Sequence, residues 1–302
     1  MFQRPAADAV FPRLTDEQVA AYQRDGYLVV PNALTPAQVK GLSDVTHEFV
    51  EQSRSVTSHT DVYDLEPSHS AQHPLLRRIK TPEKWHPTYA EVVTYPVILG
   101  ALQSLWGPAI RYQTAKLNMK VAGYGSSLEW HQDWAFYPHT NDDLAVVGVM
   151  IDDIDESNGP MLVIPGSHRG PIFDHSSGGR FVGGIDPTAV DVDFGTAAAV
   201  TGPAGSISIH HVRTLHGGAA NLSGRDRRFL LLQYRSGDAW PLVENVDWDE
   251  WRASLLTGEE TWTPRMEALP FRVPLPVPAH EGSIFENQRD MGHRFFEAAP
   301  AS

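Results

Sequence analysis

The chain has no cysteine among its 302 residues. Thiolate metal sites, iron–sulfur clusters, disulfide frameworks and cysteine nucleophiles are therefore excluded, and any metal must be held by nitrogen and oxygen. Positive charge is also scarce, because 24 Lys and Arg stand against 37 Asp and Glu, for a formal net charge of −13. Such an acidic chain does not favour nucleic acid as a partner, since phosphate backbones are bound by basic surfaces.

Long apolar runs are missing as well. The longest uninterrupted one, residues 144–151, is much shorter than a membrane span and contains a glycine. The first residues lack the apolar core of a secretory signal. These absences predict a cytoplasmic protein that does not bind a membrane, and the length is that of one large domain or two small ones.

Two capping boxes predict helices near the N-terminus. The first helix is expected from Thr15 to Gly26 and the second from about Pro36 to Glu51. The polar stretch from Ser53 to Lys84 shows no sustained period, so we predict an irregular segment there that serves as a lid. Another helix is expected over residues 89–106, where Gly107 and a proline follow.

The remainder of the chain is predicted to form short strands separated by turns rich in Gly, Pro, Asn and Asp. Their residues are 110–121, 144–152, 161–164, 206–212 and 229–235. Strands of this length and spacing indicate a sandwich or barrel. We therefore predict a single domain over residues 1–302, in which a helical elaboration with the lid (14–106) precedes a β core (107–236) and a C-terminal extension (237–302), with a short helix over 248–256.

The segment Trp130-His131-Gln132-Asp133-Trp134 carries the most informative chemistry. On or beside a strand, residues two apart face the same side, so the His131 imidazole and the Asp133 carboxylate converge. His216 follows a predicted strand closely enough to supply a third ligand. Two histidines and one carboxylate on one face of an octahedron are the ligand set of non-haem Fe(II) oxygenases.

The His-x-Asp pattern alone decides little, because it arises readily by chance. A second one, His59-Thr60-Asp61, lies in the polar stretch without a strand to orient it. Eleven residues after His216, beyond a turn, the chain returns as Arg227 and Arg228. Either guanidinium can pair bidentately with a carboxylate, such as the far end of a keto acid, and physical grounds do not choose between them.

Taken together, the motifs resemble the phytanoyl-CoA dioxygenase family of Fe(II)- and 2-oxoglutarate-dependent oxygenases. They are WHQDW at 130–134, SNGPMLVIPGSH at 157–168, and HGG at 216–218 with Asn221 and Arg227 at their offsets. The opening segments LTDEQ at 14–18 and DGYLVVP at 25–31 also resemble the N-terminus of that family. The resemblance covers roughly residues 14–236 and implies a mainly β fold with flanking helices around a double-stranded β-helix (jelly-roll, cupin-like) core.

The resemblance also implies a cofactor site. His131, Asp133 and His216 would hold Fe(II), and Arg227 rather than Arg228 would bind 2-oxoglutarate, with O2 as the second co-substrate. Asn118 is expected to be a polar contact of 2-oxoglutarate. A basic residue upstream, Arg78 or Lys80, is a candidate for a further contact. No other catalytic residue is expected beyond the iron ligands.

Two departures from the family pattern bear on the pocket. Gly218 stands where many relatives have serine, so one hydroxyl contact to the co-substrate is missing. The predicted strand at residues 144–152 has no tryptophan, which some relatives place there, so that wall of the pocket must differ. Related halogenases replace the carboxylate that is present here as Asp133, so halogenation is not expected.

The expected reaction is hydroxylation of an unactivated C–H bond of a small molecule, with desaturation, epimerisation and rearrangement as alternatives. Trp134, Phe136 and Tyr137 are expected to line the substrate pocket. One of His210 and His211 is expected to face it, and we assign His211. An acidic chain without an evident basic cluster favours a natural-product intermediate or an amino-acid-like acid over an acyl-CoA.

A different class of function is a cupin-like barrel that binds a ligand or uses its metal for non-oxidative isomerisation or hydrolysis. Those activities do not need a keto-acid clamp, so Arg227 argues against them. The oxygenase is therefore our interpretation of the sequence.

Overall fold

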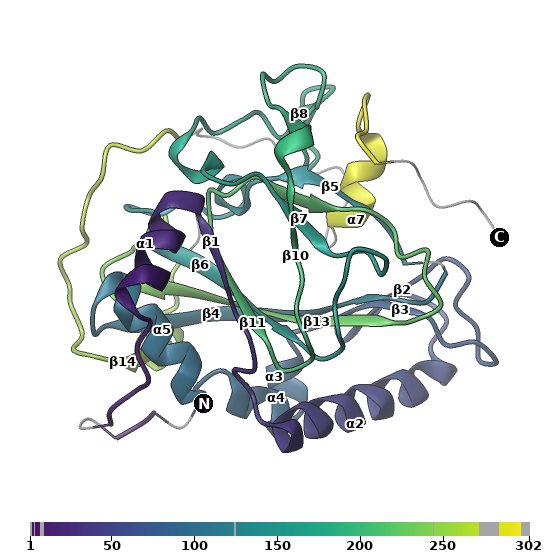
Figure 1. The fold of residues 1–302 in the computed structure, drawn as a ribbon, viewed down its shortest axis with the longest axis horizontal. Helices are drawn as coiled ribbons and strands as arrows, with labels where there is room; N and C mark the ends of the chain where they lie inside the picture. Colours follow the sequence, from purple (N-terminus) through teal and green to yellow (C-terminus); the bar gives the residue numbers. More distant parts are fainter. Residues whose placement is uncertain are drawn as a thin grey trace.

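The computed structural model describes residues 2, 4–6, 9–123, 125–243, 245–271 and 284–296. Two antiparallel sheets form its centre (Figure 1). The larger has the strand order β1-β11-β6-β13-β4-β3-β2, with β14 paired to β4, and the smaller has the order β10-β7-β12-β5. This is the mainly β, jelly-roll core that the sequence predicts.

The strands are short, apart from the long pair β4 and β13. The larger sheet contains β1 (Tyr27–Val30), β2 (Tyr63–Leu65), β3 (Leu76–Lys80), β4 (Ile110–Lys120), β6 (Leu144–Met150), β11 (Ile207–His211), β13 (Arg227–Ser236) and β14 (Leu255–Thr257). The smaller contains β5 (Leu128–His131), β7 (Met161–Val163), β10 (Ala198–Val200) and β12 (His216–Gly218), and a separate pair is formed by β8 (Ser176–Ser177) and β9 (Arg180–Phe181).

Helices lie mainly on the outer side of the larger sheet, below it in Figure 1. The helices of the described residues are α1 (Asp16–Asp25), α2 (Pro36–Gln52), α3 (Pro82–Trp85), α4 (Pro87–Val92), α5 (Pro96–Trp106), α6 (Trp248–Ala253) and α7 (Ile284–Asn287). In Figure 1, α2, α3 and α4 are below the larger sheet, whereas α1 is at the left and α7 is above it. The capping boxes of Thr15 with Gln18 and of Thr35 with Gln38 are both present, as predicted. No helix among the described residues is long and apolar enough to cross a membrane.

Two apolar cores separate the layers. Between helices and sheet, Leu42 and Leu99 pack in one cluster with Leu117 and Leu230. Between the two sheets lies a smaller cluster, made of Val146, Met150, Ile154, Met161, Val163, Val200, Phe229 and Leu231. Side chains alternate between these cores along each strand, so the polar residues that replace apolar ones on the inner face open a cavity between the sheets.

The prediction that the stretch from Ser53 to Lys84 is irregular is wrong, and its role as a lid stays a prediction. This stretch contains β2, β3 and α3, and β3 pairs directly with β4. The sequence shows no alternation of apolar and polar residues here, because β3 buries charged side chains. Arg78, for example, donates to Asp64 over 2.6 Å. Neutralised in this way, arginine can occupy a strand position where the sequence pattern calls for an apolar residue.

Smaller differences follow from local chemistry. The helix expected over 89–106 is split into α4 and α5, because Pro96 begins a new helix instead of continuing the old one. The helix expected over 248–256 ends at Ala253, and its last residues form β14. The subdivision at residue 107 stays a prediction, although β1, β2 and β3 precede that point and lie in the larger sheet.

Candidate metal centre

Three buried side chains converge between the sheets. His131 ends β5, Asp133 opens the 3-10 turn Asp133–Ala135, and His216 begins β12, directly opposite His131 in the strand register. One ligand atom from each lies within 4.8 Å of the others. The Nε2 atoms of His131 and His216 are 4.0 Å and 3.8 Å from the oxygens of Asp133. One metal ion can therefore be bound by all three.

Hydrogen bonds orient both imidazoles for a metal. Nδ1 of His131 donates to the Glu129 carbonyl over 2.8 Å, and Nδ1 of His216 donates to the Thr214 carbonyl over 2.9 Å. With the proton on Nδ1, each Nε2 presents its lone pair to the space beside Asp133. This neutral tautomer and the nitrogen–nitrogen–oxygen donor set fit ferrous iron.

Burial sets the protonation of the ligands. It lowers the pKa of His131 to about 4, against the opposing effect of Asp133, so the imidazole is neutral near pH 7. Burial alone would raise the pKa of Asp133. His216, His210 and Lys116 together hold it well below its usual range. The triad is thus in the deprotonated form that binds a metal.

The residue between the first two ligands is fixed by its neighbours. The backbone N–H of Gln132 donates to Nε2 of His175 over 2.8 Å. The Gln132 amide donates to the carbonyls of Pro171 and Arg213 and accepts from the N–H of Phe173. These bonds hold the turn that places His131 and Asp133 on one side.

A cavity opens beside the triad and carries cations on its inner wall. Lys116 and Lys120 on β4 and Arg227 on β13 line it together with Asn118, and Asp133 is the only carboxylate among the described residues of this lining. Arg227 is paired with Lys120 in the register of β13 and β4. The Oδ1 of Asn118 and the Nε of Arg227 are buried without a hydrogen-bond partner among the described residues. The Arg227 nitrogen can donate to a carboxylate, so it fits an anionic ligand such as a keto acid.

Alternation along β13 separates the two candidate arginines. Arg227 faces the cavity, and its guanidinium donates to the Gly159 carbonyl over 3.2 Å. Arg228 faces the other side, where its Nε and Nη2 bind Asp152 over 2.9 and 2.5 Å. A guanidinium already paired in this way is not available to a carboxylate in the cavity.

At Gly218, where many relatives of the family have serine, the side chain of Lys120 lies close to the backbone. A Cβ at position 218 would lie only 3.1 Å from the Lys120 ammonium nitrogen, which donates to the Ala219 carbonyl. Lys120 therefore occupies the space beside position 218. On β6, Gly148 leaves room for the ring of Phe229, which lines the cavity.

Neither of the upstream basic residues lines the cavity. Arg78 and Lys80 both pair with Asp64, Lys80 over 3.3 Å. Sequence reasoning missed Lys116 and Lys120 instead. The alternation of Lys116, Asn118 and Lys120 was a usable signal, since all three share one face of a strand.

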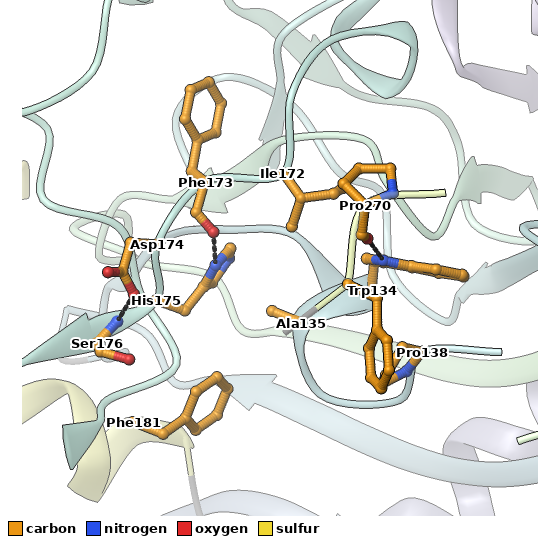
Figure 2. Close-up of a pocket in the computed structure, with 11 residues that line it drawn as sticks. Trp134, Ala135, Pro138, Ile172, Phe173, Asp174, His175, Ser176, Phe181 and Pro270 are labelled. Atoms are coloured by element: carbon orange, nitrogen blue, oxygen red, sulfur yellow. Dashed lines mark hydrogen bonds between the residues drawn. The ribbon is translucent and has the colours of Figure 1, made fainter. Parts of the chain in front are cut away.

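The aromatic residues after the ligands lie beside the cavity and not inside it. Figure 2 shows Trp134 in a neighbouring apolar pocket with Phe181 and Pro270, whose carbonyl accepts from the indole N–H over 3.0 Å. The ring centroid of Phe136 is 6.1 Å from that of His131. Tyr137 packs against the cluster around Trp134. None of the three belongs to the lining of the cavity itself.

The histidine that faces the cavity is His210, and the assignment of His211 is corrected. The Nε2 of His210 lies 3.4 Å from Asp133 Oδ2, whereas that of His211 lies 3.9 Å from Asp142 on the opposite side of β11. Consecutive strand residues point to opposite faces, and only the strand register determines which one points inward. The neighbouring β6 and β1 fix that register.

A jelly-roll core with a buried His-Asp-His triad and a cationic cavity beside it defines the class of protein. It is a non-haem Fe(II)- and 2-oxoglutarate-dependent oxygenase, which uses iron, 2-oxoglutarate and O2. The profile of the phytanoyl-CoA dioxygenase (PhyH) family matches residues 22–229, and the chain belongs to this family.

Individual relatives agree with this class. The chain is 34% identical to the probable alpha-ketoglutarate-dependent hypophosphite dioxygenase of Stutzerimonas stutzeri, over 93% of this chain and 99% of the relative. It is 30% identical to the L-proline trans-4-hydroxylase of Streptomyces griseoviridis, over 70% and 83%. The iron-bound structure of EctD from S. alaskensis, 22% identical, superposes with a TM-score of 0.65 and covers 87% of this chain and 93% of that one.

Proposed function

We propose that this dioxygenase oxidises a small anionic substrate, for which hypophosphite is the first compound to test. His131, Asp133 and His216 hold the iron in this proposal. The observation that carries it is the lining of the cavity, where three cations face a single carboxylate. The near full-length similarity to a probable hypophosphite dioxygenase supports the same choice.

The charge of the cavity favours an anion even after its cofactors are counted. Ferrous iron and 2-oxoglutarate carry equal and opposite charges, and Asp133 balances one of Lys116, Lys120 and Arg227. Two positive charges then remain without a balancing carboxylate among the described residues of the lining. Because buried charge is costly unless it is paired, a negatively charged substrate complements this site better than a neutral one.

Residues of β4 and β13 bind the co-substrate in this proposal. Arg227 and Lys120 bind the distal carboxylate of 2-oxoglutarate, and Asn118 donates to the same molecule through its amide nitrogen. When bound, iron and 2-oxoglutarate would supply the oxidation: 2-oxoglutarate would lose CO2 and become succinate with one oxygen atom of O2, and the other oxygen atom would enter the substrate. The layers around the triad keep bulk water away, since all three ligands are at most 5% exposed.

An amino-acid-like acid, the substrate expected from the sequence, is also an anion and is therefore compatible with this proposal. A carboxylate can occupy the place of the phosphorus oxyanion, with oxygen inserted into C–H instead of P–H. The similarity to an L-proline hydroxylase supports this as the second arm of the test. A CoA thioester is the contrasting case, because its bulk has to enter a buried cavity.

The test measures oxidation of each substrate by the iron-loaded protein. Anaerobic addition of Fe(II) and 2-oxoglutarate should give the weak visible charge-transfer band of a chelated keto acid, which His131→Ala should lack. With oxygen, hypophosphite should yield phosphite and succinate in equal amounts. Turnover of a neutral compound or an acyl-CoA with none of the small anions would contradict the proposal. Absence of the band in the wild type would contradict the assigned iron site.

A further inference from the structure

Lys116 differs from the other cations around the cavity. It lies on the inner face of β4, lines the cavity beside Asp133 and His210, and is only partly exposed. Within the described part of the chain, its ammonium group makes no hydrogen bond or ion pair, and burial lowers its pKa while Asp133 opposes that effect. The mechanism derived above gives it no role.

Its neighbours each have a partner. On β3, Lys80 stands directly opposite Lys116 in the strand register but pairs with Asp64. On β4, Lys120 donates to a backbone carbonyl and faces Arg227. A flexible lysine that is held inside a cavity without a partner is suited to receive a charged ligand, because pairing recovers the cost of its burial.

The spacing along β4 separates Lys116 from the distal carboxylate of the co-substrate. Four residues of extended strand span about 13 Å, which places the backbone of Lys116 well away from that of Lys120. Lys120 and Arg227 face each other at one end of the cavity, whereas Lys116 lines the cavity together with the triad and interacts electrostatically with Asp133 and Arg78. Lys116 is therefore at the iron end, where the reacting bond of the substrate must lie.

We propose that Lys116 is the residue that selects an anionic substrate, by binding its oxyanion beside the iron. This inference rests on the proposed function and names the group that recognises the substrate. A phosphorus oxyanion or a carboxylate would then lie between the Lys116 ammonium group and the triad that would hold the iron. A neutral compound of the same size leaves Lys116 without a partner and binds less well.

The experiment compares Lys116→Met, Lys116→Arg and the matched control Lys80→Met. The methionine keeps the length of the side chain without its charge, and Lys80 is a lysine of the adjacent strand that already has a partner. Binding of hypophosphite is measured by calorimetry on protein loaded with Mn(II) and 2-oxoglutarate, which does not turn over. The KM for hypophosphite and the affinity for 2-oxoglutarate are measured alongside.

Lys116→Met should weaken hypophosphite binding and raise its KM by roughly 10- to 100-fold, since a charge-assisted hydrogen bond is lost. Lys116→Arg should restore much of the affinity, and Lys80→Met should match the wild type. The affinity for 2-oxoglutarate should be unchanged in all three variants. Folding of each variant is checked by its thermal unfolding midpoint.

Three results would overturn the inference, and they have different meanings. If the wild type binds hypophosphite and Lys116→Met binds it equally well, the role of Lys116 is wrong while the proposed function stands. If Lys116→Met loses affinity for 2-oxoglutarate but not for hypophosphite, the lysine serves the co-substrate. If the wild type binds neither hypophosphite nor a small carboxylic acid, the proposed function and the inference fail together.

Discussion

Replacement of Arg227 by methionine tests the assignment of the co-substrate site. The Arg227 side chain is 5% exposed and lines the cavity, with one hydrogen bond to the Gly159 carbonyl and a buried Nε that has no partner among the described residues. Burial lowers its pKa to about 10, so the guanidinium is still charged near neutral pH. Methionine removes that charge but retains an unbranched side chain.

The expected loss follows from the bonds that a guanidinium makes with a carboxylate. Hydrogen bonds to charged groups contribute about 1.5–3 kcal/mol each, and a bidentate pair has two. Relief of the repulsion between Arg227 and Lys120 offsets part of this amount. We therefore expect a loss of roughly 3 kcal/mol, which corresponds to about a 150-fold weaker affinity for 2-oxoglutarate.

Arg228→Met is the matched control. Arg228 is the next residue of β13 but points to the other side, where it binds Asp152. Its loss should lower the unfolding midpoint while the affinity for 2-oxoglutarate stays within about twofold. Both affinities are measured by anaerobic titration of the Fe(II) protein, with the visible band as signal. A normal affinity in Arg227→Met together with a loss in Arg228→Met would refute the assignment.

Two further predictions concern stability. Burial and the neighbouring Arg235 lower the pKa of His139 to about 3 in the folded protein. As the pH falls, the His139 imidazole is therefore protonated in the unfolded chain before it is protonated in the folded protein. The free energy of unfolding should then fall by roughly 2 kcal/mol between about pH 6.5 and pH 5 on account of this residue. His139→Gln should remove that part of the pH dependence in urea titrations, and an unchanged slope would contradict the burial argument. Gly148→Ala should lower the free energy of unfolding by about 1–3 kcal/mol, because its Cβ would lie 2.2 Å from the ring of Phe229. A midpoint equal to that of the wild type would show that the ring moves freely.

Local signals in the sequence were sufficient for much of the secondary structure. The caps at Thr15 and Thr35 each form their own hydrogen bonds within a few residues, so their prediction needed no tertiary information. The strand from Ile110 and the strand around Phe229 were also predicted nearly at their observed bounds. Strand β3 was missed because its charged residues are neutralised by carboxylates from elsewhere in the chain: Arg78 and Lys80 by Asp64, and Arg77 by Glu66 and Glu286.

In the candidate site, too, some residues could be predicted from the sequence and others could not. Strand alternation made His131 and Asp133, with His216 after a later strand, candidates for metal ligands, and the family resemblance selected these three and placed Arg227 beside them. These residues are recognisable because their chemistry is unusual in that pattern. Lys116 and Lys120 were missed although they alternate with Asn118 along one face of a strand, since a lysine is usually a solvated surface residue.

The sequence by itself determined the class of ligands, the absence of thiolate chemistry and the β core. Only the tertiary structure decided that His210 and not His211 faces the His-Asp-His triad. It also decided that Arg228 forms an ion pair with Asp152 and that lysines of β4 line the cavity. The physical reason is register: moving a strand by one residue exchanges its two faces, and register is set by pairing with strands distant in the sequence. An acidic chain thereby encloses a cationic cavity, which its net charge could not reveal.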